Sequence, residues 1–144
     1  MIAHHISAFA ENKPGRLEKI TGVLAEADIN IRAIKISDIG EFGVVKILVD
    51  DPDKACRALK VAGVLASQKE IIAVAVEDRP GGLHAVLTIL TRRHINVEDS
   101  YGFVLKDRAV LVIEVANVAE ATSLLEGAGL QLLSKEQIYA LGRR

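Results

Sequence analysis

The feature that most constrains this chain is an internal repeat with a constant spacing of 66 positions. The segment ENKPGRL, which starts at Glu11, has a counterpart EDRPGGL, which starts at Glu77. The same spacing pairs further positions of like character: Leu24 with Leu90, Ile29 with Ile95, Val44 with Val110, Gly63 with Gly129 and Lys69 with Lys135. So many matches in one register indicate a duplicated unit. We therefore expect two domains, residues 1–69 and residues 70–144.

Composition narrows the class of protein. Half of the 144 residues are apolar but only 3% are aromatic, so a core has to be built from Val, Ile, Leu and Ala. The net charge of −1 gives no global field that would attract nucleic acid or anionic lipid. The single cysteine, Cys56, excludes an internal disulfide and a multi-cysteine zinc site. With neither a signal-peptide pattern nor an apolar run long enough to span a bilayer, we expect a cytoplasmic protein.

Hydrophobic periodicity predicts the same order of elements in both repeats. In the first repeat it predicts strands at 2–10, 29–36, 42–49 and 65–69, a helix at 16–28, a loop at 38–41 and a second helix from an Asp51 cap to Gly63. In the second it predicts strands at 71–76, 97–104, 108–116 and 131–134, a helix at 83–94, a helix capped by Asn117 and a helical tail at 135–141. The fold class is therefore α+β. We expect two ferredoxin-like β-α-β-β-α-β units, each a four-stranded antiparallel sheet with its helices on one face.

The expected strand at 71–76 is apolar at every position, which indicates that both of its faces are buried. A sheet with helices on one face leaves the other face uncovered. Another copy of the chain could cover that face, so we expect a homodimer.

The two Pro-Gly turns are the candidate binding elements. Pro14-Gly15 and Pro80-Gly81 each stand where a strand ends and a helix begins, and the free N–H groups of a helix start favour an anion. The amides Asn30 and Asn96 follow Asn12 and Asp78 by 18 positions each, and we expect each pair to lie near one rim. Such a rim suits a zwitterion such as a free amino acid. The plainer alternative is a tight turn followed by an asparagine helix cap.

These residues resemble the signature of the ACT domain family. The resemblance is carried by Asn12-x-Pro14-Gly15-x-Leu17 with Ile29-Asn30-Ile31, and by Asp78-x-Pro80-Gly81-x-Leu83 with Ile95-Asn96-Val97. It implies a ferredoxin-like fold that binds amino acids or other small effectors at the seam between paired domains and regulates metabolic enzymes. It also implies ligand contacts from Asn12 and Asn30, and from Asp78 and Asn96. The serine-binding members have a histidine where this chain has Ala10 and Val76, which puts serine specificity in doubt.

The two sites should differ. Asp78 is anionic where Asn12 is neutral, and Ser100, Tyr101 and Gly102 replace Ile34, Lys35 and Ile36. A glycine in a strand often marks a close approach. If the domains pair along their second strands, the Asn12 turn faces Ser100 and Gly102.

The hypothesis is thus a non-catalytic regulatory protein that binds an amino acid and acts on a separate enzyme, without a cofactor or a metal. His4 and His5 are adjacent in a strand and point to opposite faces, so they cannot easily share a metal ion. Three alternatives stay open: a regulatory subunit similar to the small subunit of acetolactate synthase, a ligand-free dimerisation scaffold, and a small enzyme of the acylphosphatase type. An RNA-recognition module is disfavoured because the expected central strands lack stacking aromatics.

Overall fold

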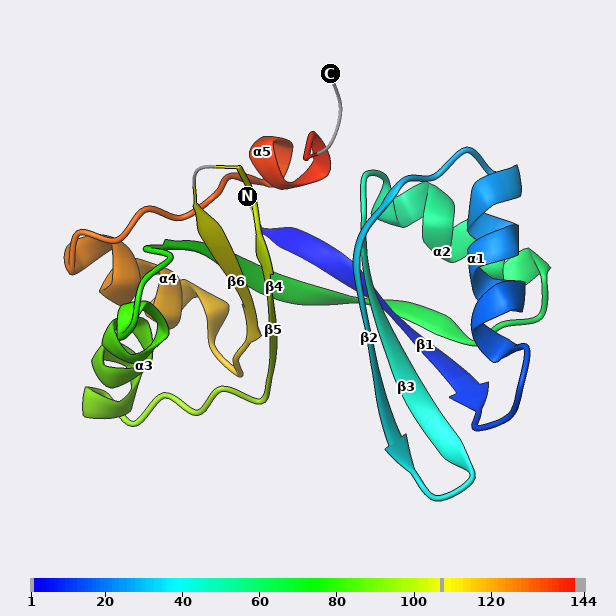
Figure 1. Cartoon of the computed structure of the whole chain (residues 1–144), viewed down its shortest axis with the longest axis horizontal. Coiled ribbons are helices and arrows are strands. Elements are labelled where there is room, and N and C mark those ends of the chain that lie inside the picture. Colours follow the sequence, from blue (N-terminus) through cyan, green and yellow to red (C-terminus); the bar gives the residue numbers. More distant parts are fainter. Residues whose placement is uncertain (1, 107, 142–144) are drawn as a thin grey trace. The chain divides into compact units, whose positions relative to one another are not determined.

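A computed structural model of the chain describes residues 2–106 and 108–141. The chain divides into two compact units that follow the repeat closely. One unit is His4–Lys69, to which Tyr139 also belongs, and the other is Glu70–Ile138, to which Ala3 belongs. Each unit has its own helices and strands (Figure 1).

The first-repeat unit contains β1 (Ala3–Glu11), α1 (Arg16–Glu26), β2 (Ile31–Ile39), β3 (Phe42–Val49), α2 (Pro52–Val61) and the beginning of β4 (Ala66–Val76). Strand β3 pairs antiparallel with β1 and with β2, so Ile47 lies between Ile6 and Ile34. Both helices lie on one side of these strands (Figure 1). Alternate strand residues meet the apolar faces of the helices in a core that includes Ile6, Val45, Ile47, Ile20, Leu24, Ala55 and Leu59.

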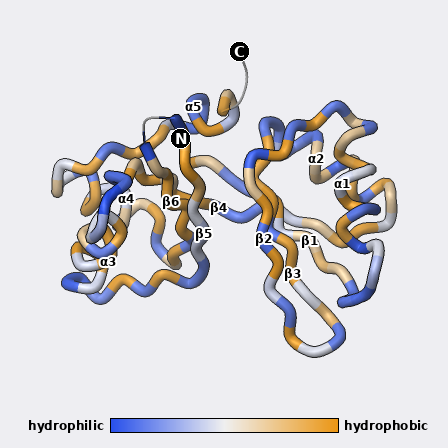
Figure 2. The backbone as a smooth tube through the Cα atoms, in the orientation of Figure 1, coloured by the Kyte–Doolittle hydropathy of each residue, from blue (hydrophilic) through white to orange (hydrophobic). Residues whose placement is uncertain are grey.

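The second-repeat unit contains the rest of β4, then α3 (Gly82–Arg92), β5 (Asp99–Val104), β6 (Ala109–Glu114), α4 (Val118–Gly127) and α5 (Lys135–Tyr139). Strand β6 pairs antiparallel with β4 and with β5. Strands β3 and β6 are largely apolar (Figure 2). The core of this unit repeats that of the first and includes Ile72, Val74, Val86, Leu90, Ile113, Ala121 and Leu125.

The expectation of two four-stranded sheets is wrong. The strands form one six-stranded sheet in the order β2-β3-β1-β4-β6-β5. The reason is that the segments expected as separate strands at 65–69 and 71–76 join without a turn into β4, a single strand of 11 residues. The segment expected as a strand at 131–134 makes only an isolated bridge between Leu132 and Val74, so it does not count as a seventh strand.

The repeat extends to backbone conformation. The left-handed glycines Gly15 and Gly81 have φ of 90° and 87°, and Gly63 and Gly129 have φ of 83° and 85°. Even the two non-glycine residues with positive φ among the described ones, Asp28 and His94, are 66 positions apart, with φ of 58° and 56°. The duplication therefore preserved each helix start and stop.

The two predicted helix caps are confirmed. The side chain of Asp51 accepts a hydrogen bond from the Lys54 N–H at 3.1 Å, and that of Asn117 accepts one from the Glu120 N–H at 3.0 Å. Strand boundaries differ slightly from expectation, since β2 continues through Asp38 to Ile39 and β5 begins only at Asp99. Within the part of the chain that the structure describes, the helices are too short or too polar to cross a membrane.

Both faces of residues 71–76, the second half of β4, are largely buried, as the uninterrupted apolar sequence of this segment predicted. Ile71 and Ala73 are 2% exposed on one face, and Ile72 and Val74 are 5% and 0% exposed on the other. This burial is present in the single chain, so it gives no reason to invoke a second copy. The homodimer stays a prediction without this argument.

Candidate functional site

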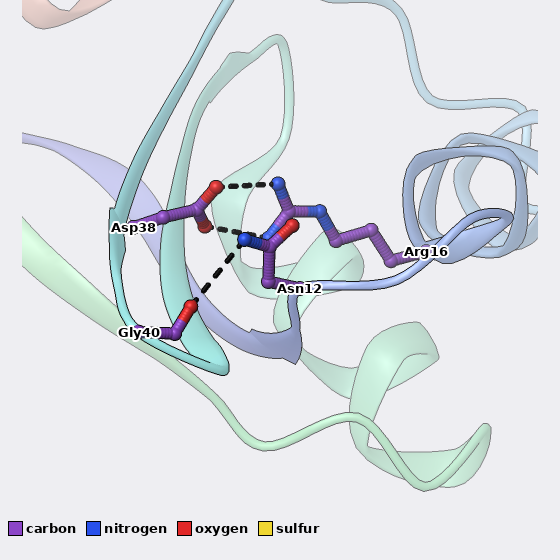
Figure 3. Close-up of polar contacts among 4 residues, drawn as sticks. All are labelled: Asn12, Arg16, Asp38 and Gly40. Carbon is purple, nitrogen blue, oxygen red and sulfur yellow. Dashed lines mark hydrogen bonds and ion pairs between the residues drawn. The ribbon is translucent and has the colours of Figure 1, made fainter.

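The first turn is tied to the tip of the β2–β3 hairpin. Asn12, Pro14 and Gly15 follow β1 and are exposed. The Asn12 backbone N–H donates to the carbonyl of Glu41 at 2.6 Å, and its Nδ2 donates to the carbonyl of Gly40 at 3.4 Å (Figure 3). Asn12 therefore has a structural role in holding the hairpin, whatever else it binds.

An ion pair joins the start of α1 to the end of β2 beside this turn. Arg16, in the first turn of α1, donates from Nη1 and Nη2 to the two carboxylate oxygens of Asp38 at 2.6 and 2.8 Å (Figure 3). The hydrogen bonds lower the pKa of Asp38 and raise that of Arg16. Gly43 makes room for the pair, because a Cβ there would collide with the Asp38 carboxylate and approach Nη1 of Arg16 at 3.0 Å. Both terminal nitrogens of Arg16 are thus bonded to a carboxylate of the chain itself.

The second turn lacks this ion pair. Asp78, Pro80 and Gly81 are exposed, and the Arg79 Nε donates to the carboxylate of Glu77. The positions of Arg16, Asp38 and Gly43 are taken by Gly82, Val104 and Ala109. Gly82 is buried, and a Cβ there would collide with the carbonyl oxygen of Glu77. The backbone at the start of α3 therefore carries no side chain at this position and lies close to the preceding strand.

A hollow lies behind each turn, between the helix start and the segment that follows the unit's second helix. The first has a volume of about 310 Å³ and is lined by residues such as Arg16, Lys19 and Gly63. The second has a volume of about 360 Å³. Every lining residue of the first hollow except Pro14 and Gly15 has its counterpart, 66 positions later, in the lining of the second. The hollows are thus a duplicated feature of the fold.

Arg108 distinguishes the second hollow. It immediately precedes β6 and lines the hollow, whereas its counterpart Phe42 does not line the first. The register that pairs Val76 with Ala109 places Arg108 beside Glu77, but the Glu77 carboxylate is held by Arg79. The Nε of Arg108 is buried and has no hydrogen-bond partner among the described residues. A buried donor without a partner is costly, so this atom calls for an acceptor.

The expectation that Asn12 and Asn30 share one rim is wrong. Asn12 contacts Gly40, just after β2 ends, while Asn30 stands just before β2 begins and exchanges bonds with Asp50. The nine residues of β2 separate them by about 30 Å. The crossover helix α1 returns the chain to the end of the sheet where β1 started. Strand β2 therefore begins at the end of the sheet that lies away from the turn. Asn96 stands at the equivalent point ahead of β5.

Neither Asn30 nor Asn96 caps a helix. Helices α1 and α3 end at the C-cap residues Ala27 and Arg93, and the left-handed residues that follow are Asp28 and His94. The plainer interpretation of the two asparagines as caps is therefore also wrong. Both are exposed, and their binding role stays a prediction.

Ser100 and Gly102 are exposed on β5, and Tyr101 between them points to the other face and is half-buried. Burial, together with the nearby carboxylates of Glu114 and Asp99, raises the pKa of Tyr101, so its hydroxyl stays neutral. A Cβ at Gly102 would meet the Val110 carbonyl at 3.4 Å, which is close to ordinary contact. The expected facing of Ser100 and Gly102 toward the Asn12 turn stays a prediction.

Sequence reasoning missed Asp38 and Arg108. Both come from the hairpin between the second and third strands of their repeat, which an antiparallel register brings beside the end of the first strand. The signal in the sequence was the charge of these two residues beside the predicted hairpin loop. The strand register that brings them next to the turn is visible only in the folded sheet. Among the described residues, no group of three or more His, Cys, Asp or Glu side chains could hold a metal ion.

Comparison with protein families agrees with this geometry. A family model described as an ACT domain pair matches residues 1–141. The chain belongs to the ACT domain pair family. The resemblance noted in the sequence is thereby confirmed, and the match covers both repeats. No curated protein matches the sequence.

Solved structures show the same fold for this ACT domain pair. A crystal structure of a Bacteroides thetaiotaomicron protein is 33% identical with a TM-score of 0.92, and the match covers 98% of each chain. Regulatory subunits of aspartate kinase from Thermus thermophilus and Thermus flavus are 16% and 19% identical, with TM-scores of 0.64 and 0.60. These two matches cover 88% and 90% of this chain and 93% and 94% of theirs.

Proposed function

We propose that this ACT domain pair is a regulatory protein that binds a small-molecule effector, an amino acid, and acts on a separate enzyme. The observation that carries the proposal is the duplicated turn with a hollow behind it, in a chain whose family match covers nearly its whole length. Binding would favour one conformation of the chain and so change the state of a partner through differential affinity.

Proteins of the same fold support the regulatory part of the proposal. The two Thermus proteins are regulatory subunits of aspartate kinase, so a chain with this arrangement of elements can serve an enzyme as a regulatory chain. Their low identity supports the fold alone, and the proposal therefore leaves the enzyme unnamed.

The composition of the hollows favours binding over catalysis. No Ser, Cys, His or Asp side chain among the described residues lines either hollow, so a nucleophile and its base do not converge there. Each hollow is lined by both acidic and basic side chains, and among the basic ones Arg108 suits an anionic group. A hollow of a few hundred Å³ is of the size that small ligands occupy.

The proposed contacts are the turn residues Asn12, Pro14 and Gly15 with their copies Asp78, Pro80 and Gly81, the amides Asn30 and Asn96, and Ser100 and Gly102. Because Asn12 and Asn30 lie at opposite ends of β2, they cannot serve the same ligand from within one repeat. The first site to test is therefore a turn with its own helix start.

A thermal-shift screen of the full chain against the free amino acids tests the proposal. A ligand that binds only the folded state, at about 100 times its dissociation constant, adds about 2.7 kcal/mol to the free energy of unfolding. Amines that lack the carboxylate serve as the matched control. A shift for one chemical class supports the proposal, and the absence of a shift for every amino acid contradicts it.

A further inference from the structure

We propose that the hollow behind the second turn is a carboxylate-binding site built on Arg108, and that the first hollow is closed to such a ligand because Arg16 already binds the carboxylate of Asp38. The inference rests on the proposed function, since it names the chemical group that the effector presents and the repeat that receives it.

Arg16 shows what an occupied arginine looks like in this fold. Its guanidinium makes a two-pronged bond to Asp38, and only 13% of its side chain is exposed. This is the geometry with which an arginine holds a carboxylate ligand. In the first repeat the chain supplies that carboxylate itself, so a ligand would have to displace Asp38.

Arg108, unlike Arg16, has no bond to a carboxylate among the described residues. Its Nε is buried without a partner among the described residues and it lines the second hollow, while the carboxylate of Glu77, which the strand register places beside it, is bonded to Arg79. The counterpart of Asp38 is Val104, which cannot accept a hydrogen bond with its side chain. In the part of the chain that the structure describes, the Arg108 Nε therefore has no internal acceptor, whereas the Arg16 guanidinium has one in Asp38.

The second hollow also lacks a large side chain at its helix start. Gly82 has no side chain to fill the hollow, where Arg16 stands in the first repeat. Helix α3 begins at Gly82 with no side-chain cap, so the N–H groups of its first turn add a favourable dipole for an anion. Asp78, whose charge would repel a carboxylate, does not line the hollow, and the charge of Glu77, which does line it, is paired with Arg79.

The other basic side chains that line the hollows are expected to contribute less to carboxylate binding. Lys19 lines the first hollow, but it is exposed, and solvent screens its charge. Arg79 lines the second hollow, but its Nε is bonded to Glu77 at the exposed surface. Arg108 is thus the group on which carboxylate binding should depend.

The experiment uses the full chain labelled with ¹⁵N-arginine and follows the Nε–Hε signals while acetate replaces chloride at constant ionic strength. Arg108→Gln and Arg16→Gln assign the two signals. We expect the Arg108 signal to move and saturate with acetate and the Arg16 signal to stay unchanged. An Arg108 signal that does not respond, or an equal response from Arg16, overturns the inference.

Two further variants sharpen the test. Asp38→Asn keeps a side chain of the same shape but removes the internal carboxylate, so Arg16 should now respond to acetate.

For an amino acid found in the thermal-shift screen, Arg108→Gln should weaken binding at least about tenfold, because a hydrogen bond to a charged group is lost. Lys19→Gln, the control at an exposed cation, should leave affinity unchanged. If the Arg16 signal in Asp38→Asn does not move with acetate, the inference that Asp38 closes the first hollow to a carboxylate is overturned.

The outcomes separate the two proposals. If an effector is found while Arg108 ignores acetate and Arg108→Gln binds normally, the proposed function stands and the carboxylate site is overturned. If Arg108 binds acetate saturably while no amino acid shifts unfolding, the carboxylate site stands and the amino-acid function is overturned. A circular dichroism spectrum and a melting curve show whether Arg108→Gln is folded, and the acetate response of the unmodified chain decides the inference if it is not.

Discussion

Gly82 and Arg16 occupy the same position of the repeat and show how a single residue sets the character of each turn. Arg16 carries a Cβ without difficulty and reaches Asp38, whereas a Cβ at Gly82 would collide with the Glu77 carbonyl oxygen. The two turns have nearly the same backbone, with φ of 90° at Gly15 and 87° at Gly81. The difference between the sites therefore lies in side chains and in the approach of one carbonyl.

Gly82→Ala should lower the free energy of unfolding by about 1–3 kcal/mol, because the methyl group has to displace backbone in a packed region. Gly22→Ala is the matched control. Gly22 lies on α1, and a Cβ added there would have nothing within 4 Å, so the same change should raise stability by about 0.5–1 kcal/mol through helix propensity. Urea denaturation of both variants measures the difference. Equal effects of the two changes would contradict the steric role of Gly82.

The Asp38–Arg16 pair should make stability depend on acid pH. The pKa of Asp38 is lowered in the folded state by its hydrogen bonds to Arg16, so its contribution is complete above the unfolded pKa of about 3.9 and is lost as the pH falls through the folded value. Asp38→Asn should therefore unfold with a weaker dependence on pH below about 4 than the unmodified chain. Urea denaturation at neutral and acid pH checks this, and parallel pH profiles would contradict it.

At the scale of elements, helix caps were the most predictable features. Asp51 and Asn117 stand directly before α2 and α4, and both side chains accept the expected bonds from Lys54 and Glu120. Local chemistry decides a cap, so the sequence is enough. The extent of β4 was predictable only in part. The sequence places the strand at 65–69 almost directly before the strand at 71–76, but it does not show that the two form one strand of one sheet.

Asn117→Ala should cost about 1 kcal/mol of stability, because α4 loses the acceptor for the Glu120 N–H. Asn96→Ala is the matched control, since Asn96 is exposed and follows α3 rather than capping it. Its effect on unfolding should stay within about 0.5 kcal/mol. Thermal or urea denaturation compares them. A loss at Asn96 as large as that at Asn117 would show that Asn96 has a structural role.

At the scale of the whole molecule, the duplication explains why the family and the plan of each unit could be predicted, while the site could be predicted only in part. The turns at Pro14-Gly15 and Pro80-Gly81 are local motifs and lie where expected, each at a helix start. Whether Asn12 and Asn30 lie at one rim depends on the end of the sheet to which the crossover helix returns the chain. The sequence motif does not give that direction. Asp38 and Arg108 reach the turns through strand register, which is a property of the folded sheet.

Two repeats that have become unequal should bind an effector through only one of them. Isothermal titration calorimetry of the full chain with an amino acid found in the thermal-shift screen measures the number of ligands per chain. We expect one ligand, because Asp38 binds the arginine of the first repeat, while the Arg108 Nε of the second has no partner among the described residues. Two equivalent ligands per chain, or no saturable heat with any amino acid, would contradict the inequality of the two repeats.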